Sequence, residues 1–136
     1  MVKIDILYEG HLRCQLTHGP SGNKITTDAP VDNMGKGEAF SPTDLVAAAL
    51  GSCMLTVMGI VASRHKINLN STTVHVEKEM VNVPIRRIAK ISVHFKMAPS
   101  IPEDKRQMLE TAAHTCPVHK SLNSEIETPV TFEYLS

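Results

Sequence analysis

The chain has 136 residues, a length that suits one domain with a single core. Its 14 basic and 14 acidic residues cancel, and only 4% of its residues are aromatic. A neutral chain with few stacking side chains offers no field to attract nucleic acid or an anionic membrane surface. We therefore expect neither nucleic acid nor a membrane among its partners.

Cysteine usage and the first residues indicate a reducing compartment. The three cysteines are widely spaced and odd in number, which is unlike a disulfide framework. Residues 1–5 mix apolar and charged side chains and lack the apolar core of a signal peptide. We expect a cytoplasmic protein.

Alternating apolar and polar residues predict strands at 2–6, 11–17 and 24–28, with a turn at residues 8–10. In the second of these strands, Arg13 lies on the face opposite Cys14, which alternates with leucines and is typical of core packing. Residues 29–40 are expected to be irregular, and their glycines lack the spacing of a phosphate-binding loop.

The longest predicted element is a helix over residues 42–64. Ser41 is a good N-cap, Pro42 fits the first helical position, and Asp44 places an acid in the first turn. Residues 45–62 carry no charge and are long enough for a membrane span, but glycine and hydroxyl residues interrupt the segment, which argues against a span. A helix that is apolar on every side must be buried on every side, which one small domain cannot provide. This pattern predicts an obligate dimer.

The second half of the chain predicts strands at 73–81, 88–97 and about 130–134, with helices between the last two. Ser100 and Glu103 suggest a capping box for the first of these helices, which Pro117 ends at Cys116. A short helix follows, with Cys116 at its N-cap. The element order indicates a single α+β domain over residues 1–136, with helices on one side of a mainly antiparallel sheet.

Two cysteines could carry chemistry, although buried, inert thiols are the more common outcome. Cys53 lies in the middle of the long helix, too far from its N-terminus for the helix dipole to favour a thiolate. Cys116 would cap the short helix, where backbone N–H groups favour the charged form. The two cysteines are far apart in the sequence, so only the fold can bring them together.

Three segments resemble the OsmC/Ohr family, the osmotically inducible protein C and organic hydroperoxide resistance proteins. The chain reads SPTDL from Ser41, AAALGSC ending at Cys53, and CPVHKSL from Cys116, and TDAP from Thr27 also matches. The resemblance covers the full length and the element order. It implies an OsmC-like fold with the long helix buried at the centre of an intertwined homodimer.

The same resemblance implies a thiol peroxidase without a metal or other cofactor. In the peroxidases of this family, the cysteine matching Cys53 attacks an organic hydroperoxide and becomes a sulfenic acid. The cysteine matching Cys116 then forms a disulfide with it, which would leave Cys14 free. An arginine from an N-terminal strand, best matched by Arg13, holds the first thiolate. The reductant is a dithiol such as a lipoylated protein.

One departure from the family pattern concerns this arginine. The well-studied peroxidases hold it with a glutamate ten residues before the first cysteine, where this chain has Thr43. The neighbouring Asp44 would point away from Cys53 on a regular helix and is better explained as a capping acid. With no recognisable acid to hold Arg13, the chain resembles the less characterised OsmC-like branch as much as the efficient peroxidases.

Other interpretations remain for the residues around the thiols. The fold could serve a non-enzymatic protein that binds a small apolar ligand or acts in the stress response. His114, Cys116 and His119 could bind a metal, although their spacing matches no established metal motif. His119 could instead assist the thiols as a base or a cation. Met54 and Met58 either line a pocket for the alkyl part of a substrate or, as we favour, fill the core of the dimer.

Overall fold

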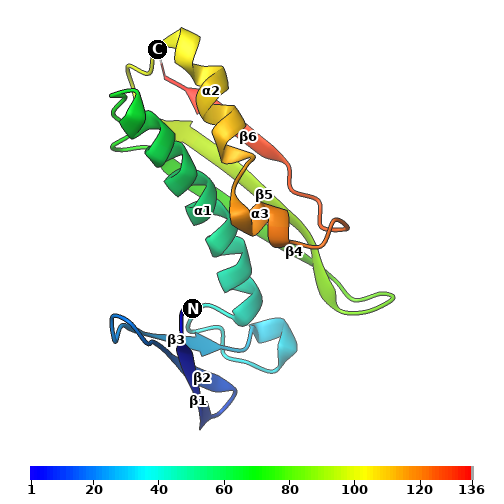
Figure 1. The fold of residues 1–136 in the computed structure, drawn as a ribbon. Helices are drawn as coiled ribbons and strands as arrows, with labels where there is room; N and C mark the ends of the chain where they lie inside the picture. Colours follow the sequence, from blue (N-terminus) through cyan, green and yellow to red (C-terminus); the bar gives the residue numbers. More distant parts are fainter. Residues whose placement is uncertain (136) are drawn as a thin grey trace. The chain divides into compact units, whose positions relative to one another are not determined.

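The computed structural model describes residues 1–135 (Figure 1), and the chain divides into two compact units with the boundary inside the long helix. The first unit comprises residues 1–46, and the second begins at residue 47. The expectation of a single domain over residues 1–136 stays a prediction, and its last residue lies outside the described residues.

The first unit contains an antiparallel sheet in the order β1-β2-β3. Its strands are β1 (Ile4–Gly10), β2 (Arg13–His18) and β3 (Lys24–Asp28). The predicted turn at residues 8–10 was wrong, because β1 continues through Gly10 and the chain turns at His11 and Leu12. Both turn residues have positive φ, 55° and 63°, the conformation that a tight hairpin needs to match the strand twist.

Residues 29–40 fold back onto the end of β3 and contain a short 3-10 helix, η1 (Val31–Asn33). The N–H of Asp28 donates to the carbonyl of Phe40 at 3.1 Å, and the N–H of Gly37 donates to the carbonyl of Ala29 at 3.3 Å. A Cβ on Gly35 would lie 1.7 Å from the Ala29 oxygen, so only glycine fits this turn. The loop is therefore held in place by hydrogen bonds rather than being a free connection.

The long helix α1 (Pro42–Arg64) begins as the sequence predicted. The Asp44 N–H donates to Ser41 Oγ at 3.0 Å, and the Ser41 N–H donates to Asp44 Oδ2 at 2.9 Å. These reciprocal bonds form a capping box, which satisfies two backbone donors at the start of the helix. Asp44 is confirmed as a capping acid.

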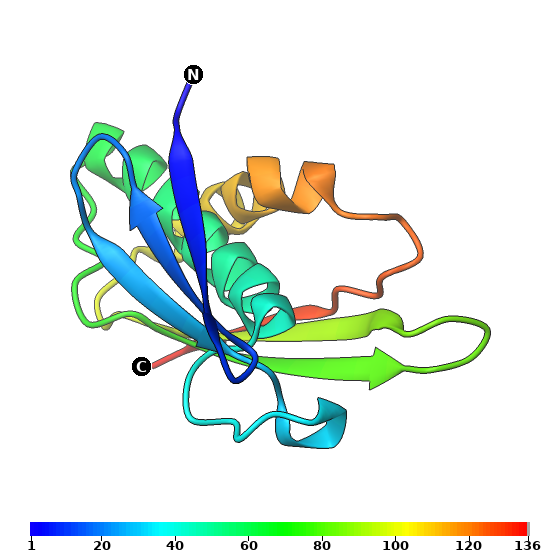
Figure 2. The same ribbon diagram turned by 90° about the horizontal axis from the view of Figure 1, so that it is seen from below.

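The second unit places three helices on one face of a sheet in the order β4-β5-β6 (Figures 1 and 2). The strands are β4 (Thr73–Val81), β5 (Arg87–Met97) and β6 (Val130–Tyr134), and the other helices are α2 (Glu103–Ala113) and α3 (Pro117–Ser121). β4 and β5 are antiparallel, whereas β6 runs parallel to β5 because α2 and α3 carry the chain back. The α+β class and the element order are confirmed, and the strands form two sheets rather than one.

The predicted capping box of α2 was wrong. Pro102 occupies the N-cap without a side-chain hydrogen bond, and Ser100 lies outside the helix with a φ of 69°. That left-handed conformation differs from the extended geometry that an N-cap residue adopts. The helix also ends at Ala113, before Cys116.

The core of the second unit lies between β5 and the helices. Met54 and Met58 are fully buried in it, so they fill the core of a single chain rather than waiting for a dimer to cover them. The buried residues of α1 form a single stripe: Ala47, Leu50, Gly51, Met54, Met58 and Ala62. Other α1 side chains, such as Ile60, are exposed. Length and hydropathy alone would let α1 cross a membrane, but its buried stripe packs on β4, as in a core helix.

Candidate active site

Cys53 lies on α1 at the edge of the buried stripe. Its neighbour Met54 is fully buried, Ser52 is exposed, and Cys53 itself is half-buried. Its thiol is free, as are those of Cys14 and Cys116. A half-buried thiol on a rigid helix remains accessible to a small reactant while its position is fixed by the packing of that helix.

Cys116 is completely buried and caps α3, as the sequence predicted. Its Sγ accepts a hydrogen bond from the His119 N–H at 3.2 Å. Pro117 explains this geometry, because it disfavours a helical conformation at Cys116 and fits the first helical position itself.

The two thiols of Cys53 and Cys116 lie close enough to interact. Burial raises the pKa of the Cys116 thiol, the His119 N–H opposes this increase, and interaction with the Cys53 side chain raises that pKa further. The expected preference of Cys116 for the thiolate was therefore wrong, because loss of solvation outweighs the cap hydrogen bond. The fold nevertheless brings together the two cysteines that the sequence singled out.

His119 and His114 do not join Cys116 in a metal site. His119 Nε2 lies 3.0 Å from Thr128 Oγ1, and its buried Nδ1 has no hydrogen-bond partner among residues 1–135. His114 instead places its ring edge against Phe132. Within the described part of the chain, no three histidine, cysteine or acidic side chains gather as metal ligands. The metal-binding alternative is therefore not supported.

Arg13 is held by two acids, contrary to our expectation. Its Nη2 lies 3.4 Å from Asp28 Oδ2 and 3.0 Å from Glu38 Oε1. The Glu38 N–H and the Arg13 guanidinium together keep the pKa of the Asp28 carboxyl below its ordinary value despite burial. Asp28 belongs to the TDAP segment, to which the sequence assigns no role, and no sequence signal points to Glu38.

The remaining candidates have local roles. Thr43 Oγ1 lies 3.2 Å from Ser41 Oγ, at the start of α1. Cys14 is half-buried on β2, between Tyr8 of β1 and Thr27 of β3 in the strand register. Arg13 and its acids belong to the first unit, and the thiol pair belongs to the second.

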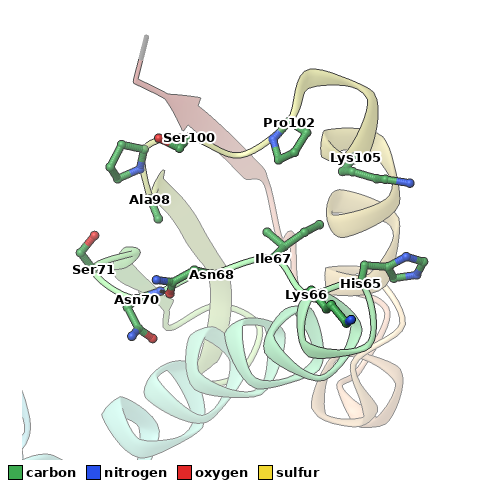
Figure 3. Close-up of a pocket in the computed structure, with 11 residues that line it drawn as sticks. His65, Lys66, Ile67, Asn68, Asn70, Ser71, Ala98, Ser100, Pro102 and Lys105 are labelled. Carbon is green, nitrogen blue, oxygen red and sulfur yellow. Dashed lines mark hydrogen bonds between the residues drawn. The ribbon is translucent and has the colours of Figure 1, made fainter.

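A pocket of about 520 Å³ opens elsewhere in the second unit, after the end of α1 (Figure 3). His65, Lys66, Asn68, Ser100 and Lys105 contribute to its polar lining. Neither Cys53 nor Cys116 lines it. This pocket is therefore separate from the thiol pair.

Comparison with known proteins places the chain among relatives of similar length. An uncharacterized protein of Acinetobacter baylyi is 28% identical over 96% of this chain and 95% of its own length. A crystal structure from Psychrobacter arcticus, provisionally described as an osmotic stress induced and detoxification response protein, is 41% identical. It covers 98% of this chain and 96% of its own, with a TM-score of 0.92.

More distant structures share the fold. The organic hydroperoxide resistance protein of Legionella pneumophila is 18% identical, with a TM-score of 0.78 over 98% of this chain and 96% of its own. The organic hydroperoxide resistance protein OhrB of Bacillus subtilis is 17% identical, with a TM-score of 0.72 over 98% of each chain. The model of the OsmC-like proteins matches residues 35–131, which include both interacting cysteines. The chain belongs to the OsmC-like protein family.

Proposed function

We propose that this protein reduces organic hydroperoxides with its thiol pair. The interaction between Cys53 and Cys116 carries the proposal, because two cysteines distant in the sequence meet within one unit. Membership in a family that includes hydroperoxide resistance proteins supports it. The chemistry needs a nucleophilic thiol, a second thiol and an external reductant, but no metal or other cofactor.

In the first step, the Cys53 thiolate attacks the terminal oxygen of the hydroperoxide. The O–O bond breaks, the sulfur is oxidised to a sulfenic acid, and the alkoxide leaves and takes up a proton to become an alcohol. The half-exposed position of Cys53 supports this role, because a small reactant can reach it. As the family resemblance implies, we assign to Arg13 the positive charge that favours the thiolate.

In the second step, the Cys116 thiol resolves the sulfenic acid. Cys116 loses its proton, its sulfur attacks the Cys53 sulfur, and the sulfenic oxygen leaves as water while a disulfide forms. A dithiol, such as that of a lipoylated protein, then returns both cysteines to thiols by exchange and is itself oxidised to a disulfide. Burial of Cys116 supports this order, because a buried thiol competes poorly for the peroxide.

The working form in this proposal is a homodimer in the cytoplasm that needs neither a membrane nor nucleic acid. The uncovered side of α1 supports the dimer, as do the apolar side chains of β1, where Ile4, Ile6 and Leu7 are each at least 60% exposed. Surfaces of this kind are usually covered by another protein surface. A second copy of the chain is the occupant that agrees with the resemblance noted in the sequence.

Stopped-flow oxidation of the reduced protein tests the function. We expect an alkyl hydroperoxide to react faster than hydrogen peroxide, because α1 is apolar around Cys53. Cys53→Ser should abolish the reaction, Cys116→Ser should preserve the first step and block the disulfide, and Cys14→Ser is the matched control. Wild-type rates equal to those of Cys53→Ser with every hydroperoxide would reject the enzyme and favour a ligand-binding protein.

A further inference from the structure

We infer that Asp28 and Glu38 together position Arg13, and that Asp28 holds it more firmly. They take the place of the glutamate that the family's peroxidases have where this chain has Thr43. This inference rests on the proposed function, in which Arg13 favours the Cys53 thiolate. It assigns a positioning role to two residues outside the family motifs that pointed to the thiols.

Asp28 is placed opposite Arg13 by the strand register. The two residues are direct partners across β2 and β3, and Asp28 Oδ2 lies 3.4 Å from Arg13 Nη2. The Asp28 side chain is completely buried, whereas that of Arg13 is 35% exposed. A buried carboxylate needs a positive partner, so Asp28 holds one end of the guanidinium at a defined place.

Glu38 reaches Arg13 from the loop after β3. Its Oε1 lies 3.0 Å from Arg13 Nη2, and its side chain is 58% exposed. Its backbone N–H donates to Asp28 Oδ2 at 3.1 Å, so Glu38 binds both members of the pair. Because an exposed ion pair is weakened by solvent and salt, Glu38 contributes less to the position of Arg13 than Asp28 does.

Hydrogen bonds of the loop after β3 hold Asp28 and Glu38 beside Arg13. Asp28 also donates its N–H to the Phe40 carbonyl, which closes the loop just beyond Glu38. The Oδ1 atom of Asp28 is buried and has no hydrogen-bond partner among the described residues. Only Oδ2 of this buried carboxylate has hydrogen-bond donors, which are the Arg13 guanidinium and the Glu38 N–H. The charged form of Asp28 therefore depends on these two donors for its stability.

The position of Thr43 explains why another acid is needed. Thr43 lies in the first turn of α1, where its hydroxyl is 3.2 Å from that of Ser41. A threonine cannot form a salt bridge with a guanidinium. The carboxylate that the peroxidases of this family supply from the long helix is therefore supplied here from β3 and its following loop.

The first test measures the order of Arg13 and needs no peroxidase activity. Signals of the Arg13 guanidinium N–H groups in ¹H–¹⁵N spectra should be protected from solvent exchange in the wild type and exchange at least about tenfold faster in Asp28→Asn. Glu38→Gln should produce a smaller change. Asp5→Asn and Glu9→Gln, which alter exposed acids on β1, are the matched controls. Unchanged Arg13 exchange in Asp28→Asn would overturn the inference, whether or not the protein is a peroxidase.

The second test asks whether this positioning matters for the chemistry. Misplacement of a catalytic group by about 1 Å can cost on the order of 100-fold in rate, so Asp28→Asn should slow Cys53 oxidation by about 10- to 100-fold. Adding Thr43→Glu to Asp28→Asn should restore much of the rate, because a carboxylate returns to the position used by the family's peroxidases. A mere loss of folding would not be rescued in this way. Loss of Arg13 order without a slower reaction would overturn the positioning role and leave the peroxidase intact.

Discussion

Asp28 should couple the stability of the fold to pH. Its pKa is lowered in the folded protein, so its charged form favours folding above the ordinary aspartate value of about 3.9. This contribution should be complete at neutral pH and decline as the pH falls below about 4. Urea unfolding between pH 7 and pH 3 should show a smaller decline for Asp28→Asn than for the wild type, with Asp5→Asn as the control. Parallel curves for Asp28→Asn and the wild type would contradict this prediction.

The rate of disulfide formation between Cys53 and Cys116 should increase as the pH rises. Because the pKa of the Cys116 thiol is raised, the reactive thiolate is a minor species at neutral pH. Its fraction increases about tenfold per pH unit below that pKa, and the decay of the Cys53 sulfenic acid should accelerate accordingly. Trapping the sulfenic acid with dimedone at pH 7, 8 and 9 measures this decay. A decay rate independent of pH would mean that proton loss from Cys116 does not limit the step.

Oxidation by one equivalent of hydroperoxide should join Cys53 to Cys116 and leave Cys14 free. The thiol pair lies within the second unit, whereas Cys14 lies on β2 of the first. Peptide mapping of the oxidised protein identifies the linked residues. A dominant disulfide through Cys14, or a sulfinic acid at Cys53 without any disulfide, would contradict the resolving role of Cys116.

At the scale of the elements, α1 packs closely against β4 at Gly51. A Cβ there would lie 2.8 Å from Val76 Cγ2 and 3.3 Å from Val74 Cγ1. Overpacking of this kind costs typically about 1–3 kcal/mol, which exceeds the intrinsic helix gain of roughly 1 kcal/mol for replacing glycine by alanine. Gly51→Ala should therefore lower the free energy of unfolding in urea, whereas Ser52→Ala on the exposed side should not. A stabilised Gly51→Ala would show that α1 can move away from the sheet without cost.

The helix signals in the sequence were reliable where residues within one turn of the chain decide the outcome. Ser41 and Asp44 formed the expected cap because both partners lie within one turn, and Pro117 fixed the geometry of Cys116 locally. The predicted N-cap at Ser100 was wrong because Pro102, which the capping-box pattern does not take into account, occupies the N-cap of α2. Local motifs predict helix ends well only when no neighbouring residue competes for the same position.

The contacts of Arg13 could not be predicted because they depend on a folded loop. The strand pattern placed Arg13 on the correct strand, but its register with Asp28 follows from the hairpin geometry. Glu38 reaches it only because the loop folds back, through a turn at Gly35 that excludes any side chain. The thiol pair was different, since family motifs identified both cysteines and the fold brought them together.

At the scale of the whole molecule, the protein should be a dimer at micromolar concentration. The described chain leaves Ile60 on α1 and several apolar side chains of β1 exposed, which a second copy would cover. Sedimentation equilibrium should give twice the mass of one chain, and Ile60→Asp should shift the protein toward a monomer without loss of helical circular dichroism. A wild type that remains a well-folded monomer at this concentration would remove the argument for the dimer.

The parallel pairing of β6 with β5 has a consequence for the order of folding. β4 and β5 are joined by a short connection and can pair as soon as both have left the ribosome, whereas β6 must wait for α2, α3 and the last residues of the chain. Contacts between distant segments form late, since a long loop must close first. Cys116 belongs to this late segment, so a nascent chain exposes Cys53 before its partner is in place. Synthesis in a reducing environment would protect that unpaired thiol until the C-terminal strand completes the sheet.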